Sequence, residues 1–298
     1  MTRKQLQVFD DHYDMLADGV RMRSYAEAIR RTIRPGDRVV DLGAGLGVLG
    51  FMALKAGAAR VYAIEKTASI DLARKVAAAN GLSDRVTFFH GNSKDFSLDE
   101  PADVLLSETL GSFGLEENTL DFTLDARQRL LREDGRMLPR AIRVFVAPVS
   151  HDPGRVAFWK DVQGLDFSPA VEELAGRMAT ADITVEDVLA GAQVYAQLDL
   201  RSHSETTVTN TLRFPIQRAG SLQGVAGWFH VSLCEGVVLK TGPDSPKTHW
   251  RQAFFPLREP TDVVPGDVFE ATLTLGPKGD RSDDTVVRLD HRCTQVPR

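Results

Sequence analysis

In the segment Arg38-Val-Val-Asp-Leu-Gly-Ala-Gly-Leu-Gly47, an apolar run leads directly into three closely spaced glycines. A helical pattern follows over residues 48–56. A strand, a tight glycine turn and a helix in this order are typical of the first unit of a doubly wound α/β sheet. Such a turn lets the backbone come close to a nucleotide-like ligand.

The same alternation continues along the chain as far as residue 139. Short apolar runs at residues 60–65, 86–90 and 102–108 have the pattern of buried strands, and residues 69–80 and 120–132 have helical patterns. Strands that alternate with helices predict a parallel, doubly wound sheet.

After Pro139 the apolar period changes to two, which predicts antiparallel strands. A sheet with many edges usually closes into a sandwich or a barrel, so we expect an α/β domain over residues 1–139 and a β-barrel-like domain over residues 140–298. Residues 156–190 interrupt the strands with a more helical pattern, and Thr184 precedes one expected helix. The expected strands cover residues 142–148, 194–200, 206–214, 228–233, 269–275 and 286–290.

Composition narrows the class of protein. The 298 residues include 36 Lys and Arg against 41 Asp and Glu, a formal charge of −5, which argues against a nucleic-acid-binding protein. Two cysteines, Cys234 and Cys293, with no Cys-x-x-Cys or histidine-rich spacing, predict neither a disulfide framework nor a metal site. The first residues lack the apolar region of a secretory signal, and no apolar stretch is long enough to span a bilayer. We therefore expect a cytoplasmic protein that binds no membrane.

Acidic residues flank the glycine turn. Asp41 precedes Gly43 and Gly45, and Glu65 ends the next strand, 22 residues after Gly43, where a carboxylate can accept hydrogen bonds from a ribose diol. Residues 45–50 also match Gly-x-Gly-x-x-Gly, which keeps a nicotinamide-dependent dehydrogenase as an alternative. An acid followed by Gly-x-Gly-x-Gly resembles the S-adenosylmethionine sites of Rossmann-like methyltransferases. No second nucleotide-binding half follows, so this resemblance favours S-adenosylmethionine as the cofactor.

The fourth expected strand ends in an acidic loop, residues 107–118. Carboxylates at the carboxyl end of a parallel strand face the ligand crevice. Glu108 and Glu117 are nine residues apart and are joined by a loop that contains Gly111 and Gly114. The two acids could therefore converge on one cation, whereas Glu116 fits a solvated position.

With these motifs in place, the chain resembles the protein arginine methyltransferase family over nearly its whole length. This resemblance implies a Rossmann-like class I methyltransferase domain followed by a β-barrel-like domain with a helical dimerisation arm. The motifs that carry it are Ser107-Glu108 with Glu117, Val20-Arg21-Met-Arg-Ser-Tyr25, Asp41 to Gly47 with Glu65, Thr248-His249-Trp250, and Gly164-Leu-Asp-Phe-Ser at the start of the arm.

The resemblance also implies roles for individual residues. Arg21 would pair with the methionine carboxylate of the cofactor and brace Glu108, while His12 would contact the cofactor and Met15 would line the active site. Asp18 would pair with His249 and so join the N-terminal helix to the second domain.

The sequence departs from the family pattern at several positions. The family's N-terminal YFxxY motif has no counterpart before Phe9, and Thr109-Leu110 replaces the usual Trp-Met after the first glutamate. Thr119 stands at the position of a second active-site methionine. Lys94 stands where an acid normally meets the adenine amine, so Ser93 and the neighbouring backbone are expected to take that role.

We therefore predict a methyltransferase that acts on a guanidino nitrogen of arginine in a protein or peptide and releases S-adenosylhomocysteine. Glu108 and Glu117 would clamp the guanidinium, and either Glu117 or the Asp18–His249 pair would accept the proton. Two alternatives keep the fold: methylation of a small metabolite, such as a guanidino compound, and a regulatory binding protein of low activity. The expected helical arm predicts a homodimer.

Overall fold

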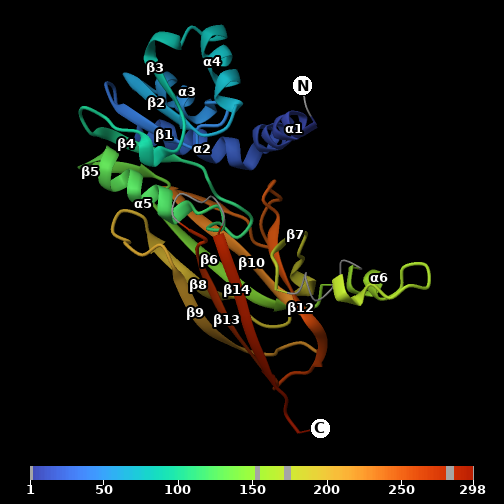
Figure 1. Cartoon of the computed structure of the whole chain (residues 1–298). Helices are drawn as coiled ribbons and strands as arrows, with labels where there is room; N and C mark the ends of the chain where they lie inside the picture. The colour runs from blue at the N-terminus through green and yellow to red at the C-terminus, as the bar shows by residue number, and fades with distance from the viewer. Residues whose placement is uncertain (1–2, 152–154, 171–175, 280–284, 298) are drawn as a thin grey trace.

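The computed structural model describes residues 3–151, 155–170, 176–279 and 285–297. Figure 1 shows a parallel sheet with its helices at one end, long antiparallel strands at the other end, and the segment that carries α6 projecting to one side.

The parallel sheet has five strands in the order β3-β2-β1-β4-β5. The order reverses between β2 and β4 on either side of β1, so the carboxyl ends of these three strands border one crevice. The strands are β1 Arg38–Leu42, β2 Arg60–Glu65, β3 Val86–His90, β4 Ala102–Ser107 and β5 Leu131–Leu138.

The fifth strand was not expected from the sequence. Residues 120–132 have a helical pattern, but the helix ends at Leu130, and β5 pairs in parallel with β4 from Leu131 onward. Charged residues at 132–134 and Gly135 hide the strand pattern, and Met137 and Leu138 are its buried residues.

Two helices precede β1 and reach across to the second domain. Asp18 is the N-cap of α2, and its carboxylate accepts hydrogen bonds from the backbone N–H groups of Val20 and Arg21. α2 packs against both α3 and the strands β10 and β11 of the antiparallel domain. The helices of this half are α1 Arg3–Ala17, α2 Gly19–Thr32, α3 Val48–Lys55, α4 Ser69–Ala79 and α5 Thr119–Leu130, with short 3₁₀ turns η1 Ser83–Arg85 and η2 Ser93–Asp95.

The antiparallel strands form two sheets. The sequence pattern predicts a barrel-like domain, but in the described residues no strand pairing joins the two sheets into a closed barrel. One sheet has the order β7-β12-β10-β6-β8, with β11 on β10, and the other has the order β14-β13-β9. The first antiparallel strand begins at Ala141, and we propose the domain boundary just before it, at residue 139. The strands are β6 Ala141–Val149, β7 Ala179–Ala181, β8 Gln193–Asp199, β9 Val208–Pro215, β10 Gly220–Cys234, β11 Val237–Lys240, β12 Gln252–Val263, β13 Val268–Pro277 and β14 Thr285–Thr294.

The described part of the insertion at residues 156–190 mixes helical and extended segments. It holds the short helix α6 Arg155–Lys160, residues 168–170 in helical conformation, the strand β7, which pairs with β12, and η3 Val185–Asp187. The helix expected after Thr184 is therefore a single turn, closed by mutual hydrogen bonds between Thr184 and Asp187. Part of the insertion, residues 171–175, lies outside the described residues.

No helix in the described part of the chain has both the length and the apolar character needed to cross a membrane.

The acidic loop is packed into the antiparallel domain through Phe113. Its ring is fully buried, with its centroid 5.5 Å from that of Tyr195 and 5.2 Å from that of Phe255. A Cβ on Gly227 of β10 would lie 2.3 Å from the Phe113 ring, so only glycine leaves room for this contact. The second domain thus fixes the loop that carries Glu108 and Glu117.

We expect Gly227→Ala to lower the free energy of unfolding by about 1–3 kcal/mol, because the added methyl overpacks a rigid aromatic cluster. Gly191→Ala is the matched control, since the nearest atom to its Cβ is 3.9 Å away, and it should change stability by less than about 0.5 kcal/mol. Urea denaturation of both variants measures the difference. Equal stability of the two variants would show that the Phe113 ring does not pack against Gly227.

Candidate active site

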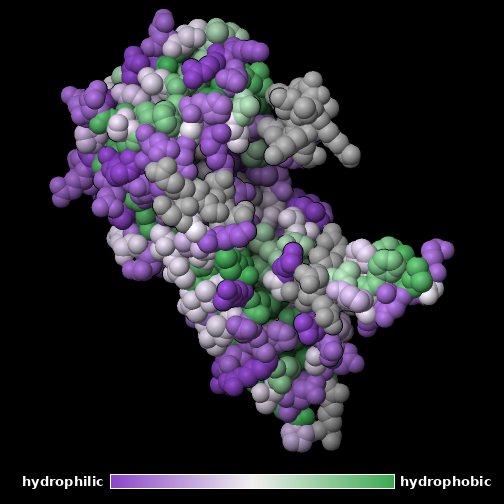
Figure 2. All heavy atoms as spheres, viewed as in Figure 1, coloured by the Kyte–Doolittle hydropathy of each residue, from purple (hydrophilic) through white to green (hydrophobic). Residues whose placement is uncertain are grey.

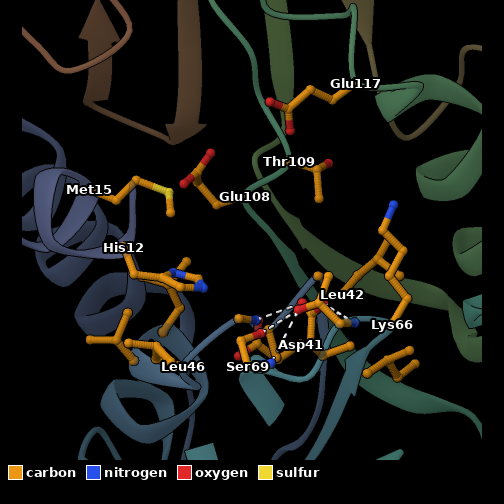
Figure 3. Close-up of a pocket in the computed structure, with 18 of the residues that line it drawn as sticks. His12, Met15, Asp41, Leu42, Leu46, Lys66, Ser69, Glu108, Thr109 and Glu117 are labelled. Atoms are coloured by element: carbon orange, nitrogen blue, oxygen red, sulfur yellow. Dashed lines mark hydrogen bonds between the residues drawn. The ribbon is translucent and has the colours of Figure 1, made fainter. Parts of the chain in front are cut away.

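A cavity of about 450 Å³ opens at the carboxyl ends of β1, β2, β3 and β4. The residues that follow each strand line it, and α1 covers one side with His12 and Met15 (Figure 3). Of the residues that the sequence singled out, those around this one cavity are His12, Met15, Arg21, Asp41, Gly43, Gly45, Glu65, Ser93, Glu108 and Glu117.

The glycine turn depends on two positive φ angles and on one close approach to His12. Gly43 and Gly45 have positive φ angles, 69° and 53°, which favour glycine. A Cβ on Gly45 would lie 2.8 Å from the ring of His12, so the imidazole packs directly over the turn. Burial lowers the pKa of His12, against an opposing effect of Glu65, so the ring is neutral at pH 7.

Asp41 links the glycine turn to the start of α3. Its Oδ2 accepts a hydrogen bond of 2.9 Å from the N–H of Gly50 in the first turn of α3. Burial, together with the nearby carboxylates of Glu65 and Glu108, raises the pKa of Asp41 to about 7. Asp41 therefore acts on the cavity chiefly by shaping the backbone.

Glu65 presents its carboxylate at the end of β2. Its Oε2 accepts from the N–H of Gly45 at 2.9 Å, and its Oε1 accepts from the N–H of Thr67 at 2.7 Å. Each carboxylate oxygen has a second lone pair, so both can still accept a hydroxyl from a ligand. Backbone donors hold the carboxylate in position for a diol.

Arg21 and Glu108 form a buried ion pair between α2 and the end of β4. The guanidinium Nε donates to Glu108 Oε2 at 2.8 Å, and Nη2 bonds to the same oxygen. Their side chains are only 6% and 5% exposed, so removing either partner would leave a buried charge uncompensated. Nη1 donates to the carbonyl of Met15 at 3.0 Å, which ties α1 to the same pair.

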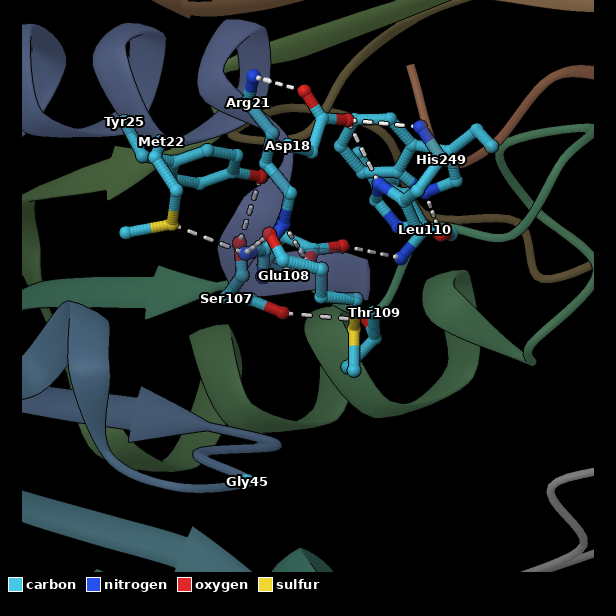
Figure 4. A network of polar contacts seen from close by, with 12 residues as sticks. Asp18, Arg21, Met22, Tyr25, Gly45, Ser107, Glu108, Thr109, Leu110 and His249 are labelled. Carbon is cyan, nitrogen blue, oxygen red and sulfur yellow. Dashed lines mark hydrogen bonds and ion pairs between the residues drawn. The ribbon is translucent and has the colours of Figure 1, made fainter. Parts of the chain in front are cut away.

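Asp18 links α2 to the second domain. Its Oδ1 caps the helix, while its Oδ2 accepts from the backbone N–H of His249 and lies 2.9 Å from the His249 ring Nδ1 (Figure 4). Burial opposes ionisation, but the hydrogen bonds from Arg21 and His249 prevail and lower the pKa of Asp18. The next residue, Trp250, donates its indole N–H to the carbonyl of Leu110, so this loop also holds the acidic loop.

The two acids at the end of the acidic loop have different surroundings. Glu117 is exposed and lines the cavity, where Figure 3 shows the carboxylates of Glu108 and Glu117 beside the same open space. Glu116, expected to be solvated, instead turns inward: its Oε1 accepts from the N–H of Phe113 at 2.8 Å, and its Oε2 is buried with no hydrogen-bond partner in the described residues. Burial raises the pKa of Glu116 to about 7.

The structure accounts for the unusual lysine at position 94. Its Nζ lies 2.8 Å from Asp121 Oδ2 of α5, and it sits over the ring of Phe122. The side chain of Ser93 remains on the cavity, and its buried Oγ has no partner in the described residues. A buried hydroxyl without a partner, on a residue that lines a cavity, calls for a polar group of a ligand.

Two features of the site could not be predicted from the sequence patterns. Thr67 acts through its backbone N–H, which side-chain patterns do not reveal. Glu116 carried one signal, because an acid between the apolar Leu115 and the second glutamate is an unusual place for a solvated side chain.

Comparison with known proteins places this geometry in a family. A family model described as the arginine methyltransferase oligomerization subdomain matches residues 140–295, and a methyltransferase domain model matches residues 33–151. A probable protein arginine N-methyltransferase 6 of Arabidopsis thaliana is 32% identical, over 89% of this chain and 72% of the relative. The chain belongs to the protein arginine N-methyltransferase family.

Further relatives and solved structures agree over most of the chain. Protein arginine N-methyltransferase 1 of Saccharomyces cerevisiae is 28% identical, over 95% of this chain and 86% of the relative. The Trypanosoma brucei PRMT1 enzyme-prozyme heterotetramer with AdoHcy superposes with a TM-score of 0.82 at 25% identity, over 95% of this chain and 96% of that one. Protein arginine methyltransferase 10 of Arabidopsis thaliana gives a TM-score of 0.80 at 27% identity, over 95% and 93% of the two chains.

We expect the stability contributed by Glu116 to depend on pH. Because burial raises its pKa from the ordinary 4.5 to about 7, the folded state holds a proton that the unfolded chain releases, so stability falls as the pH rises through this window. Glu116→Gln cannot ionise. Its stability relative to wild type should therefore rise by about 1–3 kcal/mol between pH 4.5 and pH 8.

Urea denaturation at the two pH values measures this change, and Glu259→Gln on the exposed surface of β12 is the control. If the stability difference between Glu116→Gln and wild type is the same at both pH values, Glu116 is not the buried acid described here.

Proposed function

We propose that the protein transfers a methyl group from S-adenosylmethionine to a guanidino nitrogen of arginine in a protein or peptide, and that it does so in the cytoplasm. The observation that carries this proposal is the presence of Glu108 and Glu117 on one cavity with the glycine turn of β1. Family membership supports the same reaction, and the related T. brucei structure contains AdoHcy, the expected product.

The residues around the cavity fit the cofactor. Glu65, already held by two backbone donors, would accept the ribose hydroxyls, and Ser93 Oγ would bond the adenine region. Arg21 would offer positive charge to the methionine carboxylate while it holds Glu108, and His12 and Met15 would cover the cofactor from α1. When bound, S-adenosylmethionine supplies an electrophilic methyl group on a cationic sulfonium.

Glu108 and Glu117 would supply the negative charge that binds and activates a cationic arginine side chain. An arginine side chain arrives cationic, with a pKa above ~12, and is a poor nucleophile. Glu108, fixed by Arg21, and Glu117, on the opposite side of the loop, would bind the guanidinium through charge-assisted hydrogen bonds and orient one nitrogen towards the methyl donor. Holding the nitrogen in position removes much of the entropic part of the barrier.

The position of Glu117 favours it as the acceptor of the released proton. Glu117 lines the cavity, whereas Asp18 and His249 lie behind the N-terminus of α2 and act on the cavity through Arg21. We assign Asp18 and His249 to positioning: together they fix the start of α2, and with it the Arg21 guanidinium.

Glu117→Gln should lower methyl transfer to an arginine-rich peptide about 100-fold or more, because it keeps the shape but removes a charge that stabilises the reacting guanidinium. Affinity for S-adenosylhomocysteine, measured by calorimetry, should stay within about twofold of wild type, since this role places Glu117 on the substrate.

Glu259→Gln, on the exposed surface of β12, is the control and should transfer methyl groups at the wild-type rate. Full activity of Glu117→Gln would show that Glu117 does not help to bind and orient the reacting guanidinium. Transfer to free guanidino compounds but not to peptides would move the substrate to a small molecule, the second candidate that the substitutions at Thr109 and Thr119 leave open.

We also propose that the protein is a homodimer. The match to the oligomerization subdomain spans the antiparallel domain. The projecting insertion exposes Phe158 by 55% and Leu165 by 62%, and Figure 2 shows apolar surface there. A second copy could cover this surface with the exposed apolar residues of α1, Tyr13 and Leu16.

Leu165→Asp should shift the mass measured by light scattering from dimer to monomer, because it places a charge on an apolar contact. Val238→Asp, at a comparably exposed apolar position on β11, should remain dimeric. A monomeric wild-type protein at micromolar concentration would contradict the homodimer.

A further inference from the structure

A second cavity, of about 670 Å³, lies at the junction of the two domains, away from the proposed active site. The end of α2, the last residues of β5 and the turn between β10 and β11 border it. Five arginines line what we call the arginine cavity: Arg31, Arg34, Arg136, Arg140 and Arg201.

Two of these arginines have partners that hold the wall of the cavity. Arg136 pairs with Asp37 at 2.6 Å and also bonds to the carbonyl of Thr32, at the end of α2. Arg31 pairs with Glu27 at 2.6 Å on the preceding turn of α2. Asp37 compensates the charge of Arg136, whereas Glu27 is shared between Arg31 and Arg30.

The other three arginines have no such compensation. Within the described ranges, the guanidinium groups of Arg34, Arg140 and Arg201 form no ion pair and no hydrogen bond. Glu235 is the only acidic residue that the described lining contains. This concentration of positive charge stands out in a chain whose formal charge is −5.

The fold brings these arginines together from distant parts of the sequence. The N–H of Leu200 donates to the carbonyl of Arg140 at 2.9 Å, which sets Arg201 beside Arg140. Gly236, with a φ of 76°, lets the β10–β11 turn approach α2, where Arg31 Nη1 donates to the carbonyl of Glu235 at 3.4 Å. The cavity wall is therefore built by tertiary contacts.

Unpaired guanidinium groups facing one hollow repel each other, and an anion shared between them removes that repulsion. The planar fork of arginine matches phosphate oxygens with two parallel hydrogen bonds. The volume lies within the range of small-molecule sites, and three free guanidinium groups exceed the charge of a single phosphate monoester. We propose that the arginine cavity binds a small anion that carries two or more phosphate groups.

This site is distinct from the one proposed for methyl transfer. Arg21 and Arg31 are ten residues apart on α2, which separates the two sites by about 15 Å along the helix. The charges also differ in sign: Glu108 and Glu117 attract a cationic side chain at one end, whereas the arginine cavity repels it at the other. The arginine cavity therefore does not extend the arginine-binding site.

The test is calorimetric titration of the whole protein with sodium tripolyphosphate at low salt, with and without saturating S-adenosylhomocysteine. We expect one site whose dissociation constant is the same in both conditions. The double variant Arg140→Gln/Arg201→Gln should bind at least tenfold more weakly. Methyl transfer by this variant, without added phosphate, should remain at the wild-type level.

Arg258→Gln/Arg288→Gln is the matched control, because it removes the same charge from exposed arginines of β12 and β14. It should bind tripolyphosphate within twofold of wild type. The proposal is overturned if wild type does not bind at millimolar tripolyphosphate, if S-adenosylhomocysteine displaces the anion, or if both double variants weaken equally. Binding of a single-stranded RNA, but not tripolyphosphate, through Arg140 and Arg201 would also overturn it.

Discussion

The buried ion pair between Arg21 and Glu108 is the interaction on which the rest of the site depends. It joins the first turn of α2 to the carboxyl end of β4, two segments 87 residues apart in the chain. A buried pair of this kind is costly to break, because either charge left alone would be poorly solvated. The position of α2 therefore determines the orientation of the Glu108 side chain, and through it the shape of the cavity.

Asp18 connects this pair to the second domain. One carboxylate oxygen caps α2, and the other holds His249, whose neighbour Trp250 bonds to the acidic loop. The antiparallel domain thus acts on the site twice, through Asp18 from one side and through Phe113 from the other. This explains why a domain that contributes no residue to the lining of the cavity, in the part of the chain described, can still govern its geometry.

Much of this could be predicted from the sequence, because its signals are periodic or local. The glycine turn, the acids at strand ends and the change of period after Pro139 each depend on a few adjacent residues, and the parallel sheet with its glycine turn has the expected form. Three features could not be predicted from the sequence, because its local pattern does not show them. β5 is hidden by charges at residues 132–134, the inward turn of Glu116 depends on the fold of the loop, and the arginine cavity forms only by tertiary contacts.

The site also shows why substitutions at family positions need not abolish a shared chemistry. Lys94 stands where the family has an acid, but it pairs with Asp121 of α5. The hydroxyl of Thr119, at the start of α5, donates to the carbonyl of Thr109 in the acidic loop. Both changes are absorbed locally, while the Arg21–Glu108 pair is kept.

Identifying the modified amino acid shows whether this acidic cavity methylates arginine. The protein would be incubated with isotopically labelled S-adenosylmethionine and a cell extract, and the labelled proteins would then be hydrolysed and analysed by mass spectrometry. We expect label in methylated arginine, with lysine and histidine unlabelled. Label confined to another amino acid, or to small molecules alone, would contradict it.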